Sequence, residues 1–171
     1  TITPGETGTF SPLFLDFLSG KESLQGYYTS APSAAGVAEQ LELKKGFAQT
    51  SRDTLVATLK EQYGSLAAGT AVAESINALA EPSTFTITTG HQLNIFTGPL
   101  YFIYKIVTVI NACKELQATH PEHRFVPVYW MASEDHDFEE IASFRLFNQS
   151  YTWETSQTGP VGRMNPQELD T

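Results

Sequence analysis

A Gly-His-Gln tripeptide at residues 90–92 directly follows a run of β-branched and aromatic residues, 85–89. Gly90 would let the backbone turn sharply or approach a ligand closely. His91 could donate a hydrogen bond to charge that develops on a phosphoryl oxygen, and Gln92 could orient a ligand through either end of its amide. The alternative is a strand end followed by an ordinary turn, and the tripeptide alone does not decide between the two.

Gly98 and Pro99 follow a few residues later and predict the beginning of a helix. Proline suits the first turn because its missing N–H would have had no partner there. The unpaired N–H groups and positive dipole end of such a helix favour a phosphate or a carboxylate. Lys105 lies about two turns into the helix, where it could reach back to an anion or extend out of the apolar layer. Gly98-Pro99 is also an ordinary helix entrance.

A second polar segment combines three carboxylates with an imidazole, in the order Glu134, Asp135, His136 and Asp137. Such a set could hold a divalent cation such as magnesium with a nucleotide, bind an amine, or supply a general base. Acidic residues also favour a helix start, and Asp137 with Glu140 has capping-box spacing. A cap needs no histidine, so we expect at least one of Asp135 and His136 to be functional. We assign no residue to a metal.

Several neighbouring residues are expected to be structural. Glu139 and Glu140 are predicted to be solvated helix positions, and Trp130 to be a core residue rather than a stacking platform for a base. Cys113, the only cysteine, has no partner for a disulfide, and nothing suggests an oxidising compartment. We predict that Cys113 is a buried small hydrophobe rather than a nucleophile.

The elements that must position the two polar segments form a strand, helix, strand pattern. Residues 85–89 and 125–130 predict strands, and residues 99–117 predict the helix between them. This order implies parallel pairing, and ligands of open α/β sheets lie at the carboxyl ends of the strands. Both polar segments should therefore lie on one edge. The first half of the helix is apolar on nearly every face, which predicts burial.

Helices are predicted before this unit. Residues 10–20 predict a short helix capped by Ser11, and residues 34–79 predict helices with breaks near Gly46 and at residues 64–69. Beyond the unit, residues 138–141 could begin a helix, and two short strands are expected at residues 144–147 and 151–153.

We predict one truncated α/β domain in three parts. Residues 1–80 would be a helical segment that packs on the core, residues 81–154 a Rossmann-like βαβ core, and residues 155–171 a loop that leads into further sequence. The tail is assigned to a loop because it is polar, rich in Gly and Pro, and has no clear period.

The charge of the chain limits its partners. A formal net charge of -9 argues against a general electrostatic hold on nucleic acid or on an anionic membrane, both of which require a basic surface. No apolar run approaches the length of a membrane span, and residues 1–8 lack the pattern of a secretory signal. We therefore expect a cytoplasmic protein that acts on small molecules.

Three stretches of the sequence resemble a known family, the bacillithiol-biosynthesis cysteine-adding enzymes. They are TTGHQLNIFTGPLYFIYKI at residues 88–106, FVPVYWMASEDHDFEEI at residues 125–141 and, more weakly, SPLFLDFL at residues 11–18. The resemblance covers most of residues 11–147. It implies a Rossmann-like parallel sheet core related to nucleotidyltransferases, and a cytoplasmic ligase that joins L-cysteine to the amino group of glucosaminyl malate through an amide bond.

The resemblance also implies that the chain is the N-terminal portion of a longer enzyme, whose further segments include a coiled coil that supports a homodimer. ATP and magnesium are candidate cofactors, and one hypothesis is an adenylated or phosphorylated cysteine held at the His91 loop. Other possibilities are a nucleotidylyltransferase that uses the same loop, and a nucleotide-binding module without catalysis.

Site residues carry over only at matching positions. The predicted catalytic residues are His91, Asp135 and His136. The predicted cofactor-binding residues are Gly90, His91, Gln92, Gly98 and Pro99. The predicted substrate-binding residues are Gln92, Glu134 and Asp137.

Overall fold

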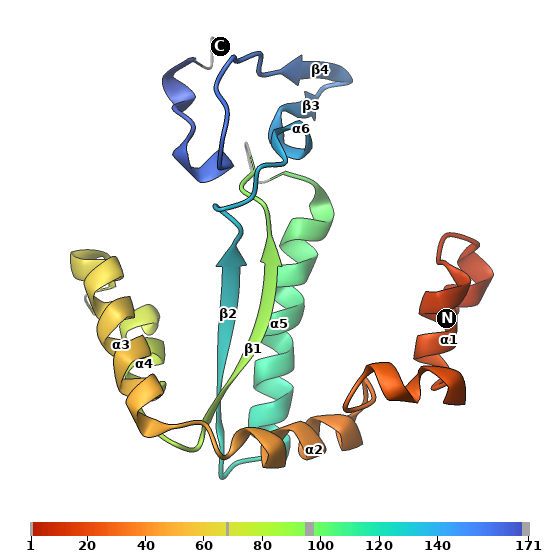
Figure 1. Cartoon of the computed structure of the whole chain (residues 1–171), viewed down its shortest axis with the longest axis vertical. Helices are drawn as coiled ribbons and strands as arrows, with labels where there is room; N and C mark the ends of the chain where they lie inside the picture. Colours follow the sequence, from red (N-terminus) through yellow and green to blue (C-terminus); the bar gives the residue numbers. More distant parts are fainter. Residues whose placement is uncertain (1, 68, 95–97, 169–171) are drawn as a thin grey trace. The chain divides into compact units, whose positions relative to one another are not determined.

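The computed structural model of the chain describes residues 2–67, 69–94 and 98–168 (Figure 1). It forms two compact units that divide between Arg52 and Asp53. This boundary falls inside helix α3 (Gln49–Tyr63), so the unit of residues 53–171 includes most of that helix.

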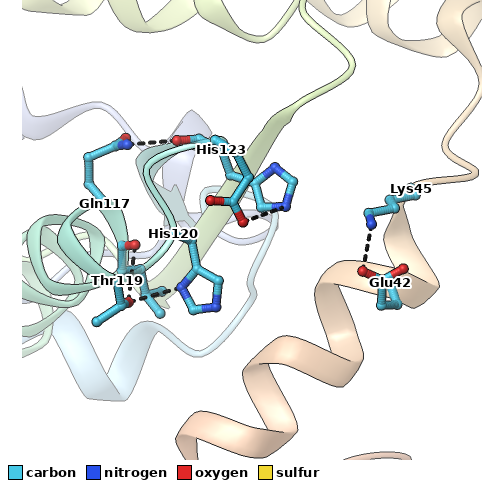
Figure 2. Close-up of polar contacts among 8 residues, drawn as sticks. Glu42, Lys45, Gln117, Thr119, His120 and His123 are labelled. Atoms are coloured by element: carbon cyan, nitrogen blue, oxygen red, sulfur yellow. Dashed lines mark hydrogen bonds and ion pairs between the residues drawn. The ribbon is translucent and has the colours of Figure 1, made fainter.

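The unit of residues 1–52 contains the 3-10 helices η1 (Pro4–Thr7) and η2 (Glu22–Tyr27) and the α-helices α1 (Pro12–Leu18) and α2 (Ala34–Lys44). Ser11 caps α1 as predicted, because its hydroxyl accepts the Phe14 N–H at 3.2 Å. Gly20, with a φ of +70°, follows the end of α1 in the left-handed conformation that glycine adopts without strain. Near the end of α2, Lys45 pairs with Glu42 (Figure 2).

Helices α3, η3 (Gly64–Ala67) and α4 (Ala71–Ala78) precede the sheet. The predicted helical breaks, near Gly46 and within residues 64–69, are confirmed. Thr70 caps α4 through a bond from the Ala73 N–H to its hydroxyl.

Strands β1 (Thr84–His91) and β2 (Arg124–Met131) pair in parallel, and helix α5 (Leu100–Thr119) connects them. The register runs from Thr84 opposite Arg124 to His91 opposite Met131. The predicted strand, helix, strand unit and its parallel pairing are therefore confirmed, together with the α/β class preceded by helices. Both strands are longer than the sequence pattern indicated, and β1 continues through His91.

Successive residues of β2 point to opposite faces, and each face is covered by different helices. Val126 packs with Val56 of α3 and with Ile76 and Leu79 in a buried cluster. On the other face Tyr129 contacts Phe102 of α5, with ring centroids 5.4 Å apart. Figure 1 shows both strands between α4 and α5. The sheet thus lies between two helical layers, as in an α/β fold.

Two predictions of burial are wrong. The outer side of α5 carries apolar side chains that are exposed, namely Leu100, Ile103, Tyr104, Val107 and Ile110. Tyr101 is half exposed, although its ring contacts His91. The helix packs on the sheet with one face only, which leaves the opposite apolar face without a neighbour among the described residues. Trp130 is 59% exposed rather than part of the core. It is the last residue but one of β2 and does not belong to the buried cluster that Val126 forms with α3 and α4.

The turn that joins α5 to β2 is fixed by side chains at the end of the helix. The Gln117 amide donates to the carbonyl oxygen of His123 at 2.7 Å, and the Thr119 hydroxyl lies 2.9 Å from His120 Nδ1 (Figure 2).

Cys113, on the inner face of α5, is buried as predicted. Among the described residues, no helix combines the length and the apolar character that a membrane span requires.

After β2 come the short helix α6 (Phe138–Ile141), the antiparallel strands β3 (Ser143–Leu146) and β4 (Gln149–Thr152), and the 3-10 helices η5 (Val161–Arg163) and η6 (Pro166–Glu168). Phe147 and Asn148 join the two strands with positive φ values of 47° and 64°, which are the dihedrals of a two-residue hairpin turn.

Part of the tail packs on this region. Val161 is 4% exposed and packs with Ile141 and Trp153 in a second buried cluster. The polar, Gly-rich composition of the tail did not indicate this contact, because Val161 is the buried residue that makes it.

Candidate functional site

The two polar segments meet at the carboxyl ends of β1 and β2. His91 is the last residue of β1 and lies opposite Met131, the last residue of β2. The Ala132 N–H donates to the carbonyl oxygen of His91 at 3.1 Å, and the Tyr129 hydroxyl donates to the same oxygen at 3.2 Å. The prediction that both segments lie on one edge of the sheet is confirmed.

His91 is buried, with 9% of its surface exposed, and belongs to the strand rather than to a loop. Its ring contacts Tyr101 and Phe102 of α5, with centroids 5.1 Å and 6.1 Å away. Parallel pairing continues to Met131, and this extends β1 beyond the glycine that was expected to end it. The imidazole therefore points into the layer between sheet and helix.

Both ring nitrogens of His91 have protein partners. Nε2 lies 2.9 Å from the Tyr101 hydroxyl. Nδ1 lies 3.1 Å from the Gln92 carbonyl oxygen and 3.0 Å from Nδ2 of Asn94. Asn94 Nδ2 also donates to the Gln92 carbonyl oxygen at 2.8 Å, which fixes the orientation of the Asn94 amide because a carbonyl can only accept.

Gln92 connects the first segment to the second. Its side-chain Nε2 donates to Oδ2 of Asp135 at 3.0 Å, across 43 residues of sequence. The other oxygen of Asp135, Oδ1, accepts the backbone N–H of Asp137 at 3.0 Å. Both oxygens of the carboxylate are thus engaged, and the bond to Gln92 brings together two residues that the sequence singled out independently.

These hydrogen bonds stabilise the charged form of Asp135. The N–H of Asp137 and, next, the amide of Gln92 hold the pKa of the Asp135 carboxyl below its ordinary value of 3.8. A general base works best when its pKa lies near the working pH. Asp135 is therefore a weak proton acceptor at neutral pH and is suited to hold a cation or to orient Gln92.

Gly90 and Gly98 each have a structural reason to be glycine. A Cβ on Gly90 would lie 3.1 Å from the carbonyl oxygen of Trp130, because the strands approach closely there. Gly98 has a φ of +59°, and a Cβ on it would lie 2.4 Å from Oδ1 of Asn94. The missing side chain of Gly98 thus makes room for Asn94, which in turn contacts His91. Residues 95–97 lie outside the described residues.

Helix α5 begins one residue later than predicted. Pro99 is its N-cap, with φ −71° and ψ 153°, and provides no side-chain cap. Lys105 turns back toward the strand end, where its Nζ donates to the Gly90 carbonyl oxygen at 3.2 Å. Its Nζ also lies 5.5 Å from the centroid of the Tyr101 ring. Lys105 thus reaches back to a neutral carbonyl, and the prediction that it binds an anion stays a prediction.

The other acidic residues do not converge with Asp135. Glu134 accepts a hydrogen bond from Trp130 Nε1 at 3.1 Å. His136 is exposed, and Asp137 is the N-cap of α6 without a side-chain capping bond, so the capping-box alternative is wrong. Glu139 and Glu140 are exposed as predicted. Within the part of the chain that the structure describes, no three His, Cys, Asp or Glu side chains group as metal ligands would.

Sequence reasoning missed two kinds of residue. Asn94 and Tyr101 hold His91, and a signal for Tyr101 existed in its polar hydroxyl within an otherwise apolar helix entrance. The tail supports the acidic segment through the Val161 N–H, which donates to the Asp135 carbonyl oxygen at 2.8 Å. Gly162 packs so closely that a Cβ would lie 2.6 Å from that of Ser133. No local pattern indicated this return of the chain.

Comparison with known proteins gives one consistent result. Residues 2–171 match the family model described as bacillithiol biosynthesis BshC, N-terminal Rossmann-like domain. A protein of Flavobacterium psychrophilum named "Putative cysteine ligase BshC" is 46% identical over 170 residues, which are 98% of this chain and 32% of that protein.

Proteins with the same name in other organisms show the same relation. The one in Cytophaga hutchinsonii is 48% identical over 154 residues, or 90% of this chain and 29% of its own. The one in Natranaerobius thermophilus is 32% identical over 135 residues, or 77% of this chain and 25% of its own. The chain spans about a third of the length of the curated relatives that it matches over nearly its whole length.

Proposed function

The chain belongs to the BshC family of bacillithiol biosynthesis, as an N-terminal Rossmann-like domain, and on this premise we propose that its full-length protein is a ligase that adds L-cysteine to glucosaminyl malate. The reaction would join the cysteine carboxyl to the amino group of the sugar as an amide. The relatives' name supports a cysteine ligase, and the substrate pair and bond type are our proposal.

The structural observation that carries this proposal is the hydrogen bond between Gln92 and Asp135. It joins a segment suited to an anionic group with a segment that is negatively charged. A ligase that condenses an activated carboxyl with an amine needs these two environments side by side. The expected substrates have the matching chemistry, because one offers a carboxyl group and the other an amine.

On the carboxyl side, the groups available are Gln92, Lys105 and the first turn of α5. Amide formation from a free carboxylate requires activation of that carboxylate, and ATP would supply it when bound. The residues fit a phosphate-bearing group, since Lys105 is an exposed cation next to the Gly90 carbonyl and the helix start provides N–H donors. His91 lies beneath this surface and holds it in place through Tyr101.

On the amine side, the groups available are Asp135, His136 and Asp137. The amino group of an amino sugar is an ammonium ion until it loses a proton, and it can attack only as the neutral amine. Asp135 is ionised at neutral pH, and its hydrogen bonds stabilise this charged form further by lowering its pKa, so it suits binding of the ammonium form. We assign the proton acceptor to His136, whose imidazole is exposed and is the kind of side chain that most often serves as a general base.

The described residues show no group of three metal ligands, so no step is assigned to magnesium here. Glu134 remains a proposed substrate contact, although its carboxylate already accepts the Trp130 indole N–H. Gly90, Gly98 and Pro99 would act through the backbone, by placing the strand end and the helix start at this edge.

The direct test is a mass-spectrometric assay of the full-length protein with cysteine and glucosaminyl malate, with and without ATP and magnesium. We expect a product with the mass of the two substrates minus water, and its dependence on ATP identifies the activating cofactor. The variant His136→Gln should lower turnover roughly ten- to a hundred-fold. His120→Gln, at the opposite end of β2, is the matched control and should retain turnover.

Absence of the product from a folded, full-length protein would refute the ligase. Release of pyrophosphate from a nucleoside triphosphate on addition of a phosphorylated substrate, with transfer of the nucleotide to that substrate, would then indicate a nucleotidylyltransferase. Nucleotide binding that survives His136→Gln, without any turnover, would indicate a non-catalytic binding module.

A further inference from the structure

The buried position of His91 raises the question of which group meets a ligand at this edge. The imidazole is 9% exposed, and both of its nitrogens are within hydrogen-bond distance of protein groups. A ligand could reach either nitrogen only by displacing one of these partners. His91 is therefore poorly placed for direct contact, although the sequence marks it as the candidate catalytic residue.

Tyr101 is the exposed partner of this pair. It lies in the first turn of α5, with 51% of its surface exposed, while its hydroxyl sits 2.9 Å from His91 Nε2. A hydroxyl has one hydrogen to donate and two lone pairs, so one bond to the imidazole leaves capacity for a second partner. Tyr101 thus contacts the buried imidazole and is itself partly at the surface.

A cation lies over the Tyr101 ring. Nζ of Lys105 is 5.5 Å from the centroid of the Tyr101 ring and bonds the neutral carbonyl of Gly90. No carboxylate among the described residues forms an ion pair with Lys105. In a chain with a net charge of -9, an exposed lysine that turns toward a backbone carbonyl and an aromatic ring, and not toward a carboxylate, favours an anionic ligand.

From these contacts we infer that Tyr101 and Lys105 contact an anionic group of the ligand, a phosphate or a carboxylate, and that His91 is a positioning residue that orients the Tyr101 hydroxyl. Asn94 belongs to the same arrangement, because it fixes Nδ1 of the ring. The inference deepens the proposed function, on which the identity of the ligand rests, by naming the side chains that touch the ligand and its chemical class.

The test measures binding, which does not depend on ligation. Full-length protein is titrated with inorganic phosphate in one arm and with malate in the other, by calorimetry, and wild type is compared with Tyr101→Phe. Loss of one hydrogen bond to a charged group should weaken binding of the recognised anion roughly ten-fold or more. Stronger binding of phosphate identifies a nucleotide or activated acyl group, and stronger binding of malate identifies the second substrate.

Tyr104→Phe is the matched control, since Tyr104 lies on the same helix, is 62% exposed and forms no side-chain hydrogen bond in the described structure. It should bind as wild type does. Lys105→Gln should weaken binding while Lys105→Arg keeps most of it, and this pair tests the site even if Tyr101→Phe unfolds.

The inference is overturned if wild type binds neither anion. It is equally overturned if Tyr101→Phe and Lys105→Gln bind like wild type, or if Tyr104→Phe loses as much as Tyr101→Phe. The ligase assay separates the two hypotheses: product formation by Tyr101→Phe at the wild-type KM and kcat would remove the inference and leave the proposed function standing. If Tyr101→Phe loses anion binding and the wild type catalyses no ligation, the contacts of Tyr101 with the anion stand and the proposed function is refuted.

Discussion

The side-chain amide of Gln92 donates a hydrogen bond of 3.0 Å to Oδ2 of Asp135, and this bond links the ends of two parallel strands. The backbone contributes a second link, from the Ala132 N–H to the His91 carbonyl oxygen. The side-chain link can be changed by substitution while the backbone link is left in place. Substitution of Gln92 therefore tests the effect of the side-chain bond on activity while the pairing of the strands is kept.

Gln92→Leu is expected to lower kcat/KM of the ligation roughly ten-fold, with little change in the midpoint of thermal unfolding, because it removes the amide that orients Asp135 at the site. Steady-state kinetics of the full-length protein measure the effect. Gln117→Leu removes a comparable amide at the far end of α5 and should leave kcat/KM unchanged. Equal losses of activity and stability in Gln92→Leu would reduce Gln92 to a structural role.

Asp135 should shape the acid side of the stability profile. Its folded pKa is lowered, so its stabilising contribution is complete above the ordinary value of 3.8 and is lost as the pH falls through the lower folded pKa. Asp135→Asn should therefore flatten the decline in unfolding free energy below about pH 4. Urea denaturation at a series of pH values measures it. The Asp137 side chain makes no capping hydrogen bond, so Asp137→Asn is the control, and its unfolding free energy should fall with pH as that of the wild type does.

Gly98→Ala is expected to destabilise the protein through two effects. The φ of +59° costs about 1 to 2 kcal/mol for an alanine, and the added Cβ would collide with the Asn94 side chain. Gly64→Ala has a similar φ of +48° with open space around it, so it carries the backbone cost alone. Denaturant unfolding should show a larger loss for Gly98→Ala, by about 1 kcal/mol or more. Equal losses would mean that Asn94 moves away freely.

The thiol of Cys113 should react slowly in the folded protein. Burial against the sheet raises the pKa of the thiol, which keeps it in the unreactive neutral form, and limits access of a reagent. Ellman's reagent at pH 8 should modify Cys113 only after urea is added, in a background where other cysteines of the full-length protein are replaced. In Cys113→Ala with Asn111→Cys, the exposed thiol on the same helix should react at once. Fast modification of Cys113 without urea would contradict its burial.

The secondary structure was largely predictable because it depends on local signals. Ser11 caps α1, the helical breaks occur where glycine lies, and β-branched runs became β1 and β2. The end of β1 was not predictable from local signals. Strand β1 continues to His91 because β2 offers pairing partners as far as Met131, which is a property of the sheet.

Burial on α5 was predicted incorrectly for a related reason. Apolar residues cover nearly all of its faces, but a two-stranded sheet can cover only one side of a helix. Val109 and Cys113 are buried on that side, whereas Leu100 and Tyr104 remain exposed. Composition indicates which residues would gain from burial, and the number of neighbouring elements decides which of them obtain it.

The site was predictable in its position and less so in its contacts. Parallel pairing was sufficient to bring Gln92 and Asp135 to one edge. The contacts of Asn94 and Tyr101 with His91, and of Val161 with Asp135, depend on how the chain folds between these residues. The spacing of residues along the sequence does not predict such contacts. The N–H of Asp137 is the main cause of the lowered pKa of Asp135, and the hydrogen bond from Gln92, across 43 residues, adds to it. Only the second of these depends on distant parts of the sequence.

The parallel pairing of β1 with β2 also sets how this region opens. Thr84 lies beside Arg124 and His91 beside Met131, so the whole of α5 is enclosed in the stretch of chain that the pairing closes. Separation of the strands would uncover the inner side of α5 at the same moment, since the helix contacts both of them. The backbone amides of β1, α5 and β2 should accordingly exchange with deuterium as one cooperative group, and the edge that carries His91 would be lost or kept with that group as a whole.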